Sequence, residues 1–256
     1  MAEINILLGG FPGRSERGYL GWSGCYLLTT GKGQKVLFDT GGYNERAVVV
    51  AKLAERGISP ASLDLVILSH LHFDHAANWD VFPKAEIVVH ERELAYASSP
   101  EADGAVLRFH AQALRAERRV RVVAGDEIAL TPELTLLHVP GHTPGAIALA
   151  AEGAILCGDA LKSRWDLQGK LSPPWWNEAE AMRSIERLRA SGAVLYPGHD
   201  VPLERVGGEI KPRGTPSVRI FFPDKSEHVV AAPDREGLRI VRRVFPSRDR
   251  APAPSA

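Results

Sequence analysis

The chain carries a dense group of polar side chains directly after one of its most apolar stretches. Leu65 to Leu68 form an apolar run, and residues 70–75 then read His-Leu-His-Phe-Asp-His. A short apolar run bounded by turn-forming residues is typical of a buried strand. Imidazoles and carboxylates bind transition metals, and packing does not explain four of them within six residues. The sequence therefore predicts a metal site at the end of a buried strand.

Three shorter motifs downstream extend this predicted site. They are His142 in Gly-His-Thr-Pro-Gly, Asp159 in Cys-Gly-Asp and His199 in Pro-Gly-His-Asp. With the hexapeptide they supply five imidazoles and two carboxylates, enough for two ions when one carboxylate bridges them. The alternative is a set of unrelated polar residues. It would require five of the nine histidines to fall by chance into glycine-bounded loops after strands.

Apolar runs alternate with amphipathic stretches along the chain. The expected strands span 24–30, 35–39, 65–69, 85–90, 119–123, 127–130, 134–139, 146–150, 154–157, 193–196, 218–222, 228–232 and 238–244. The expected helices span 45–56, 101–118 and 178–190. The polar motifs follow strands in this assignment, so the site is expected in loops at the edge of a rigid sheet.

Composition narrows the class of protein. The 256 residues carry 31 Lys+Arg and 31 Asp+Glu, so the net charge gives no sign of a nucleic-acid partner. No segment has the length of a membrane span or the pattern of a signal peptide, which predicts a cytoplasmic protein with no membrane partner. We expect a single domain over residues 1–250 and a disordered Pro/Ala tail over 251–256.

The order of these motifs carries a family resemblance. His70-x-His72-x-Asp74-His75, followed by His142, Asp159 and His199, resembles the metallo-β-lactamase superfamily over the segment from Asp39 to about His199. The resemblance implies an α+β fold, a four-layer αββα sandwich with a dinuclear metal site on one edge of its two sheets. It implies that one ion is bound by His70, His72 and His142, that the other is bound by Asp74, His75 and His199, and that Asp159 bridges them. The implied cofactors are two divalent metal ions, with zinc favoured and iron, manganese or cobalt as alternatives.

A second turn also fits the resemblance. Phe38-Asp39-Thr40-Gly41 resembles an early Asp-Thr-Gly turn of the superfamily, in which the Asp orients a ligating histidine. Ligating imidazoles commonly donate their other N–H to a carboxylate, which suits that role. The alternative for Asp39 is an ordinary Asx turn after a strand.

Residues 69–93 look most like the N-acyl-homoserine lactonase branch of the superfamily. That resemblance implies a dinuclear hydrolase in which a bridging hydroxide attacks the lactone or ester carbonyl of a small-molecule substrate. Asp74 is expected to bind metal and to pass a proton to the leaving group. The branch usually has a Tyr three residues after the bridging Asp, whereas this chain has Lys162. Lys162 either supplies a cation to an oxyanion or anionic substrate group, or is a solvated loop lysine.

Other functions remain open. A thioester hydrolase similar to glyoxalase II is the runner-up, but it implies a helical C-terminal region, and the chain after His199 is rich in Pro, Gly and short apolar runs. A mononuclear iron persulfide dioxygenase and a non-catalytic metal-binding scaffold are less favoured, because the full set of ligand positions is kept. A homodimer also stays open.

Four aromatic residues are expected near the site. An apolar pocket for the substrate is predicted to include Phe73, Trp165, Trp175 and Trp176. The alternative is that the tryptophans cover a sheet edge or an interface.

Overall fold

The computed structural model describes residues 2–171, 175–223, 227–231 and 239–243, the last of these as backbone only. The chain divides into two compact units, Met1–Gly214 and Thr215–Ala256. The first unit contains every residue of the predicted metal site.

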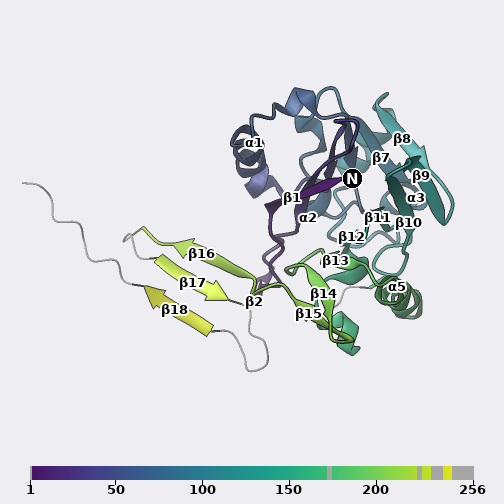
Figure 1. Ribbon diagram of the computed structural model, residues 1–256. Helices are drawn as coiled ribbons and strands as arrows, with labels where there is room; N and C mark the ends of the chain where they lie inside the picture. The colour runs from purple at the N-terminus through teal and green to yellow at the C-terminus, as the bar shows by residue number, and fades with distance from the viewer. Residues whose placement is uncertain (1, 172–174, 224–226, 232–238, 244–256) are drawn as a thin grey trace, which may run out of the picture. The chain divides into compact units, whose positions relative to one another are not determined.

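The first unit is built on two large sheets (Figure 1). One sheet has the strand order β1-β4-β5-β6-β7-β8, with the bounds Glu3–Leu8, Cys25–Thr29, Lys35–Phe38, Leu65–Ile67, Glu86–His90 and Val120–Val123. The other has the order β15-β14-β13-β12-β11-β10-β9, with the bounds Glu209–Pro212, Leu203–Val206, Val194–Pro197, Ala154–Gly158, Ile147–Ala151, Leu134–His138 and Glu127–Thr131. A separate small hairpin pairs β2 (Arg14–Ser15) with β3 (Gly18–Tyr19).

The alternation of side chains along the strands explains why the sheets stack. In β4, Leu27 belongs to one apolar core while Tyr26 and Leu28 belong to another, because successive side chains of a strand point to opposite faces. The second of these cores also takes Leu136 and Leu149 from the other sheet, so it lies between the two sheets.

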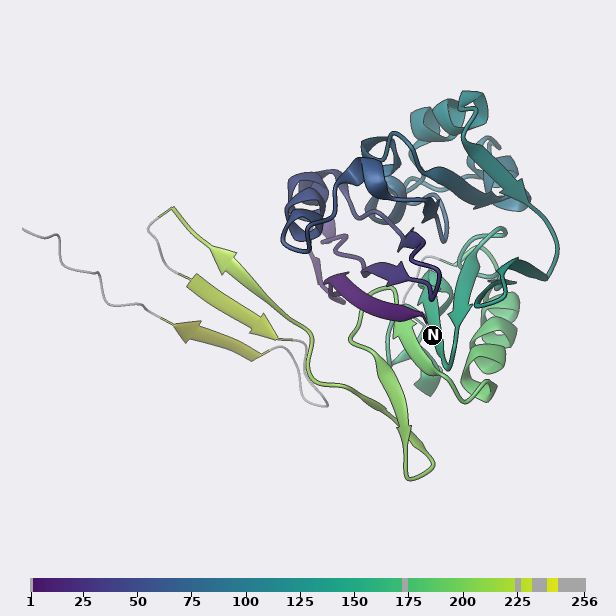
Figure 2. The same ribbon diagram turned by 45° about the horizontal axis from the view of Figure 1, so that its top comes forward.

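Helices cover the two outer faces. The five α-helices among the described residues are α1 (Arg46–Ala54), α2 (Phe73–Ala76), α3 (Glu91–Ala97), α4 (Arg108–Ala116) and α5 (Glu178–Ala190). Leu53 of α1, Leu94 of α3 and Leu114 of α4 pack in the core that includes Leu27. Ile185 of α5 packs with Leu195 of β13 in a third core. Helix α5 lies on the outer face of the second sheet (Figure 2). The predicted α+β class and αββα layering are confirmed.

Most predicted elements are present, but one predicted helix begins in the wrong place and the short helices α2 and α3 were missed. The helix expected over 101–118 begins only at Arg108. The Asp103 carboxylate accepts the Ala105 amide at 2.8 Å, a local turn that competes with helix formation. Helix α3 was not predicted, and neither was the β14–β15 hairpin around Gly207 and Gly208, both of which have positive φ.

The second unit contains a three-stranded antiparallel sheet of β16 (Ser217–Phe221), β17 (Glu227–Ala231) and β18 (Arg239–Arg243). These strands confirm the three expected in the C-terminal part of the sequence. The single domain over 1–250 stays a prediction, and the predicted tail over 251–256 lies outside the described residues. Across the described part of the chain, no helix has both the length and the apolar character needed to cross a membrane.

Gly145 lies where two parts of the fold approach each other closely. A Cβ atom at this position would lie 2.0 Å from the backbone nitrogen of Glu93. Backbone atoms of a packed helix cannot move aside as a flexible side chain can. The contact therefore requires glycine.

We expect Gly145→Ala to lower the free energy of unfolding by about 1–3 kcal/mol, the usual cost of overpacking. Gly9→Ala is the matched control, because its Cβ would meet no atom within 4 Å. Denaturant unfolding of both variants measures the difference. Equal stability of the two variants would show that the Glu93 backbone gives way.

Candidate metal centre

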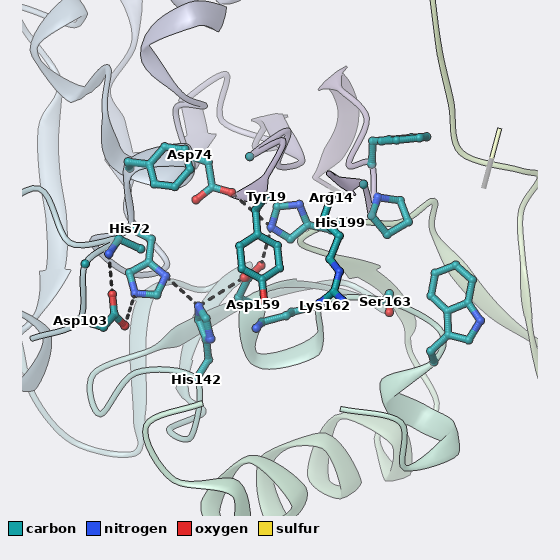
Figure 3. A pocket seen from close by; sticks show the side chains of 18 residues that line it. Arg14, Tyr19, His72, Asp74, Asp103, His142, Asp159, Lys162, Ser163 and His199 are labelled. Atoms are coloured by element: carbon teal, nitrogen blue, oxygen red, sulfur yellow. Dashed lines mark hydrogen bonds and ion pairs between the residues drawn. The ribbon is translucent and has the colours of Figure 1, made fainter. Parts of the chain in front are cut away.

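The seven predicted ligands converge at one edge of the two sheets. Figure 3 shows five of them, His72, Asp74, His142, Asp159 and His199. Residues 70–75 follow β6 and enter α2, while His142 lies in the loop between β10 and β11. Asp159 follows β12, and His199 follows β13. Strands β12 and β13 are parallel neighbours, so their carboxyl ends meet at the same edge.

His70, His72 and His142 form the first group. One ring nitrogen from each lies within 4.8 Å of the others. Nδ1 of His72 lies 2.9 Å from Nε2 of His142. Nε2 of His70 is buried and has no hydrogen-bond partner among the described residues.

Asp74, His75 and His199 form a second group, in which one ligand atom from each residue again lies within 4.8 Å of the others. Nε2 of His199 lies 3.4 Å from Oδ2 of Asp74. Nε2 of His75 lies 3.9 Å from that same oxygen. The two imidazole nitrogens therefore face one carboxylate.

Asp159 lies between the two groups. Its Oδ2 is 3.3 Å from Nε2 of His142, in the first group. Its Oδ1 is 3.2 Å from Nε2 of His75 and 3.3 Å from Nε2 of His199, in the second. One carboxylate thus presents a different oxygen to each group, the arrangement that a bridging ligand needs.

Asp39 holds the metal-binding segment in place. Its Oδ1 accepts the Ser69 amide at 2.7 Å, and its Oδ2 accepts the Ser69 hydroxyl at 2.8 Å. The same Oδ2 lies 2.8 Å from Nδ1 of His75. Asp39 adopts φ 59, a conformation that non-glycine residues seldom tolerate unless their surroundings enforce it. The position fits the orienting role expected from the sequence and goes beyond an ordinary Asx turn.

Two further imidazoles, those of His72 and His199, are also anchored at their outer nitrogen. Nε2 of His72 lies 3.0 Å from Oδ2 of Asp103. Nδ1 of His199 lies 3.1 Å from the Trp22 carbonyl oxygen. Each contact leaves the other ring nitrogen facing the cluster, which fixes the ring orientation.

Glu93 is a buried residue that the sequence analysis missed. Its carboxylate accepts the Leu71 amide at 2.9 Å, the Thr143 hydroxyl at 2.7 Å and the Gly145 amide at 3.2 Å. It therefore ties the segment that carries His70 and His72 to the loop that carries His142. Its partners lie 22 to 52 residues away, so no local sequence pattern could indicate this contact.

The electrostatics suit cations. Burial raises the pKa of Asp159, but the imidazoles of His199 and His75 outweigh it and hold that pKa well below its usual value. Burial lowers the pKa of His75, but the Asp159 and Asp74 carboxylates hold it well above its usual value. For His70, burial and the neighbouring imidazoles lower the pKa well below its usual value. Ionised carboxylates and neutral imidazoles are the forms that bind metals, so Asp159 and His70 are held in their binding forms, and metal binding would release a proton from His75.

The donor atoms left without hydrogen bonds agree with this assignment. Among the described residues, Nε2 of His70, Nε2 of His75 and Oδ1 of Asp159 are buried and form no hydrogen bond, although the last two atoms lie 3.2 Å apart. Buried polar atoms are normally satisfied, so three in one cluster call for a ligand that accepts nitrogen and oxygen donors. Divalent metal ions fit the residues present.

A cavity of about 670 Å³ opens over the cluster. Its wall includes Phe73, Trp165 and Lys162. Trp175 is not part of that wall. It packs against two wall residues, with its ring 5.6 Å from the His142 ring and 4.5 Å from the Lys162 ammonium. Trp176 is 43% exposed and also lies outside the wall.

The fold and the cluster together define a metallohydrolase of the αββα type. A model of the metallo-beta-lactamase superfamily matches residues 23–199, and the chain belongs to this superfamily. It is a metal-dependent hydrolase.

Among the proteins with sequences similar to this chain are N-acyl homoserine lactonases. An N-acyl homoserine lactonase from a Bacillus species is 28% identical over 214 residues, covering 71% of this chain and 82% of that protein. The N-acyl homoserine lactonase AttM of Azorhizobium caulinodans is 31% identical, covering 59% of this chain and 63% of AttM.

Solved structures share the fold. The hydrolase AbOPH of the beta lactamase superfamily gives a TM-score of 0.65 at 19% identity, covering 83% of this chain and 94% of that one. Another solved structure is an N-acyl homoserine lactone hydrolase with its product N-hexanoyl-L-homoserine bound at the catalytic metal centre. Its TM-score is 0.55 at 23% identity, and the match covers 73% of this chain and 86% of that one.

We expect Asp39→Asn to weaken metal binding about 10–100-fold, because an amide cannot accept all three hydrogen bonds that fix Ser69 and His75. Competition with a chromophoric chelator measures the affinity. Asp80→Asn is the control, since Asp80 forms a half-exposed ion pair with Arg46. Unchanged affinity in Asp39→Asn would contradict the orienting role.

Proposed function

We propose that this protein hydrolyses an ester or lactone bond with two divalent metal ions, zinc first among the candidates. His70, His72 and His142 would hold one ion, and Asp74, His75 and His199 the other. The observation that carries the proposal is the position of Asp159, whose two oxygens face different groups of imidazoles at 3.2–3.3 Å. A site for a single ion would not need a carboxylate with both oxygens directed at separate imidazole groups.

The residues around the ions would divide the remaining work. Bound divalent ions lower the pKa of water to about 7 and polarise a carbonyl oxygen. Asp74 lines the cavity, so its carboxylate is within reach of a bound substrate and would pass a proton to the leaving alcohol. Lys162 lies three residues after Asp159 on the cavity wall and adds a positive charge there.

Two lines of support favour a lactone or ester. Both relatives described above are named as N-acyl homoserine lactonases, and one structure of this fold holds an N-acyl homoserine product at its metal centre. The cavity has the size of a small-molecule site, and Phe11, Phe73 and Trp165 give it apolar wall area for an acyl chain.

A thioester substrate is the second candidate, but the C-terminal part of the chain does not match the region that such a hydrolase is expected to have. The resemblance to glyoxalase II implies a helical region after the last ligand. The described residues after His199 instead form strands β14 to β18.

Metal content and activity test the proposal together. Purified protein is expected to contain about two divalent ions per chain and to open an acyl-homoserine lactone, with proton release as the readout. Chelation should abolish turnover, and added zinc should restore it. Two ions without lactone or ester hydrolysis would reject the substrate class, and one iron per chain would reject the two-metal mechanism.

Asp74→Asn separates proton transfer from metal binding. We expect the variant to lose roughly 10²–10⁴-fold in kcat, since an amide cannot carry the proton. Metal content of the same preparation controls for loss of an ion. A variant with both ions and full turnover would remove Asp74 from the proton path.

A further inference from the structure

The small β2–β3 hairpin is rooted beside the metal centre. At its base the Phe11 amide donates to the Trp22 carbonyl at 2.9 Å, and the Leu20 amide donates to the Gly13 carbonyl at 3.1 Å. The same Trp22 carbonyl lies 3.1 Å from Nδ1 of His199. The base of the hairpin is therefore fixed relative to one predicted metal ligand, whereas its strand residues are exposed.

This hairpin places a cation on the cavity wall. Arg14 and Tyr19 are paired across the hairpin, and both line the cavity over the metal centre. Arg14 forms no ion pair with any carboxylate in the described part of the chain. In Figure 3 the side chains of Arg14, Tyr19 and Lys162 point into the same part of the cavity.

Lys162 supplies a second cation from the turn that follows Asp159. It is only 7% exposed, and its ammonium lies 4.5 Å from the centre of the Trp175 ring. This cation–π contact favours a charged amine at the cavity wall. Arg14 and Lys162 thus come from different parts of the fold and meet at one cavity.

The acidic groups of the cavity are already engaged. Asp103 contacts His72 at 3.0 Å, while Asp74 and Asp159 face the imidazoles of the metal groups. Bound divalent ions would more than offset the charges of Asp74 and Asp159. The loaded cavity would then carry a net positive potential, concentrated by its apolar walls.

We propose that Arg14 and Lys162 form an anion-binding end of the substrate cavity. On this proposal, which rests on the hydrolase function above, the substrate is an ester or lactone that carries a carboxylate or phosphonate-like group in addition to its scissile bond. The planar fork of Arg14 suits paired oxygens, and the Lys162 ammonium supplies a point charge. The site selects acidic molecules over neutral ones.

Binding to the metal-loaded protein tests this directly. Isothermal titration would compare glutarate and 3-phosphonopropanoate with pentanoate, which keeps one carboxylate for the metals but lacks the second anionic group. We expect both dianions to bind about tenfold or more tightly than pentanoate, and the gain to shrink at high salt. The dianion with the larger gain identifies the preferred group, and equal affinity for all three would overturn the proposal.

Variants of the hairpin locate the effect. Arg14→Gln and Lys162→Met should each lower the affinity for the preferred dianion about tenfold, a larger loss than the same variants show for pentanoate. Arg17→Gln is the matched control, because Arg17 lies in the turn of the same hairpin and does not line the cavity. Unchanged dianion binding in Arg14→Gln would show that the hairpin takes no part.

Kinetics separate this proposal from the hydrolase function. Two esters that differ only in a carboxylate or carboxamide on the acyl chain are compared by kcat/KM, and we expect about tenfold preference for the acid. Equal turnover of both esters would refute the anion site and leave the hydrolase intact. No turnover of either would refute the ester substrate class, while the titrations would still decide the anion site.

Discussion

The metal centre depends on one buried carboxylate at the junction of two strands. Strands β5 and β6 run parallel, with Phe38 opposite Ile67, and Asp39 emerges from one strand as Ser69 emerges from the other. Three hydrogen bonds to the Asp39 carboxylate determine where the chain goes after β6. Because a buried carboxylate without partners would be costly, the turn after β6 and the carboxylate hold each other in place.

The second sheet meets this junction through an equally close contact. A Cβ on Gly198 would lie 2.1 Å from Oδ1 of Asp159, so only glycine lets the ends of β12 and β13 come together. The Tyr26 hydroxyl of the first sheet donates to the Pro197 carbonyl at 2.9 Å, just before the His199 turn. The two sheets are thus cross-linked beside the residues that they present jointly, and the geometry of the cluster follows from how the sheets stack.

Local sequence patterns predicted much of this fold and of the metal site. Apolar runs located most strands, and the order of histidines and aspartates placed the site at their ends. What the sequence could not give depends on contacts between distant segments. Glu93 joins residues at separations that no periodicity reveals, and the Asp103 turn overrode a helical pattern that began at Glu101. The Gly207-Gly208 pair, by contrast, was a readable hairpin signal, because two successive glycines favour a tight two-residue turn.

The placement of the β2–β3 hairpin bears on how such a protein can diversify. The predicted metal ligands follow strand ends and are mostly buried, so a substitution there disturbs packed neighbours. Arg14 and Tyr19 stand on exposed strands of two residues each, outside the two large sheets. Mutations at these exposed positions cost little folding stability. The side chains that face a substrate at the metals can therefore change in evolution while the two large sheets stay the same.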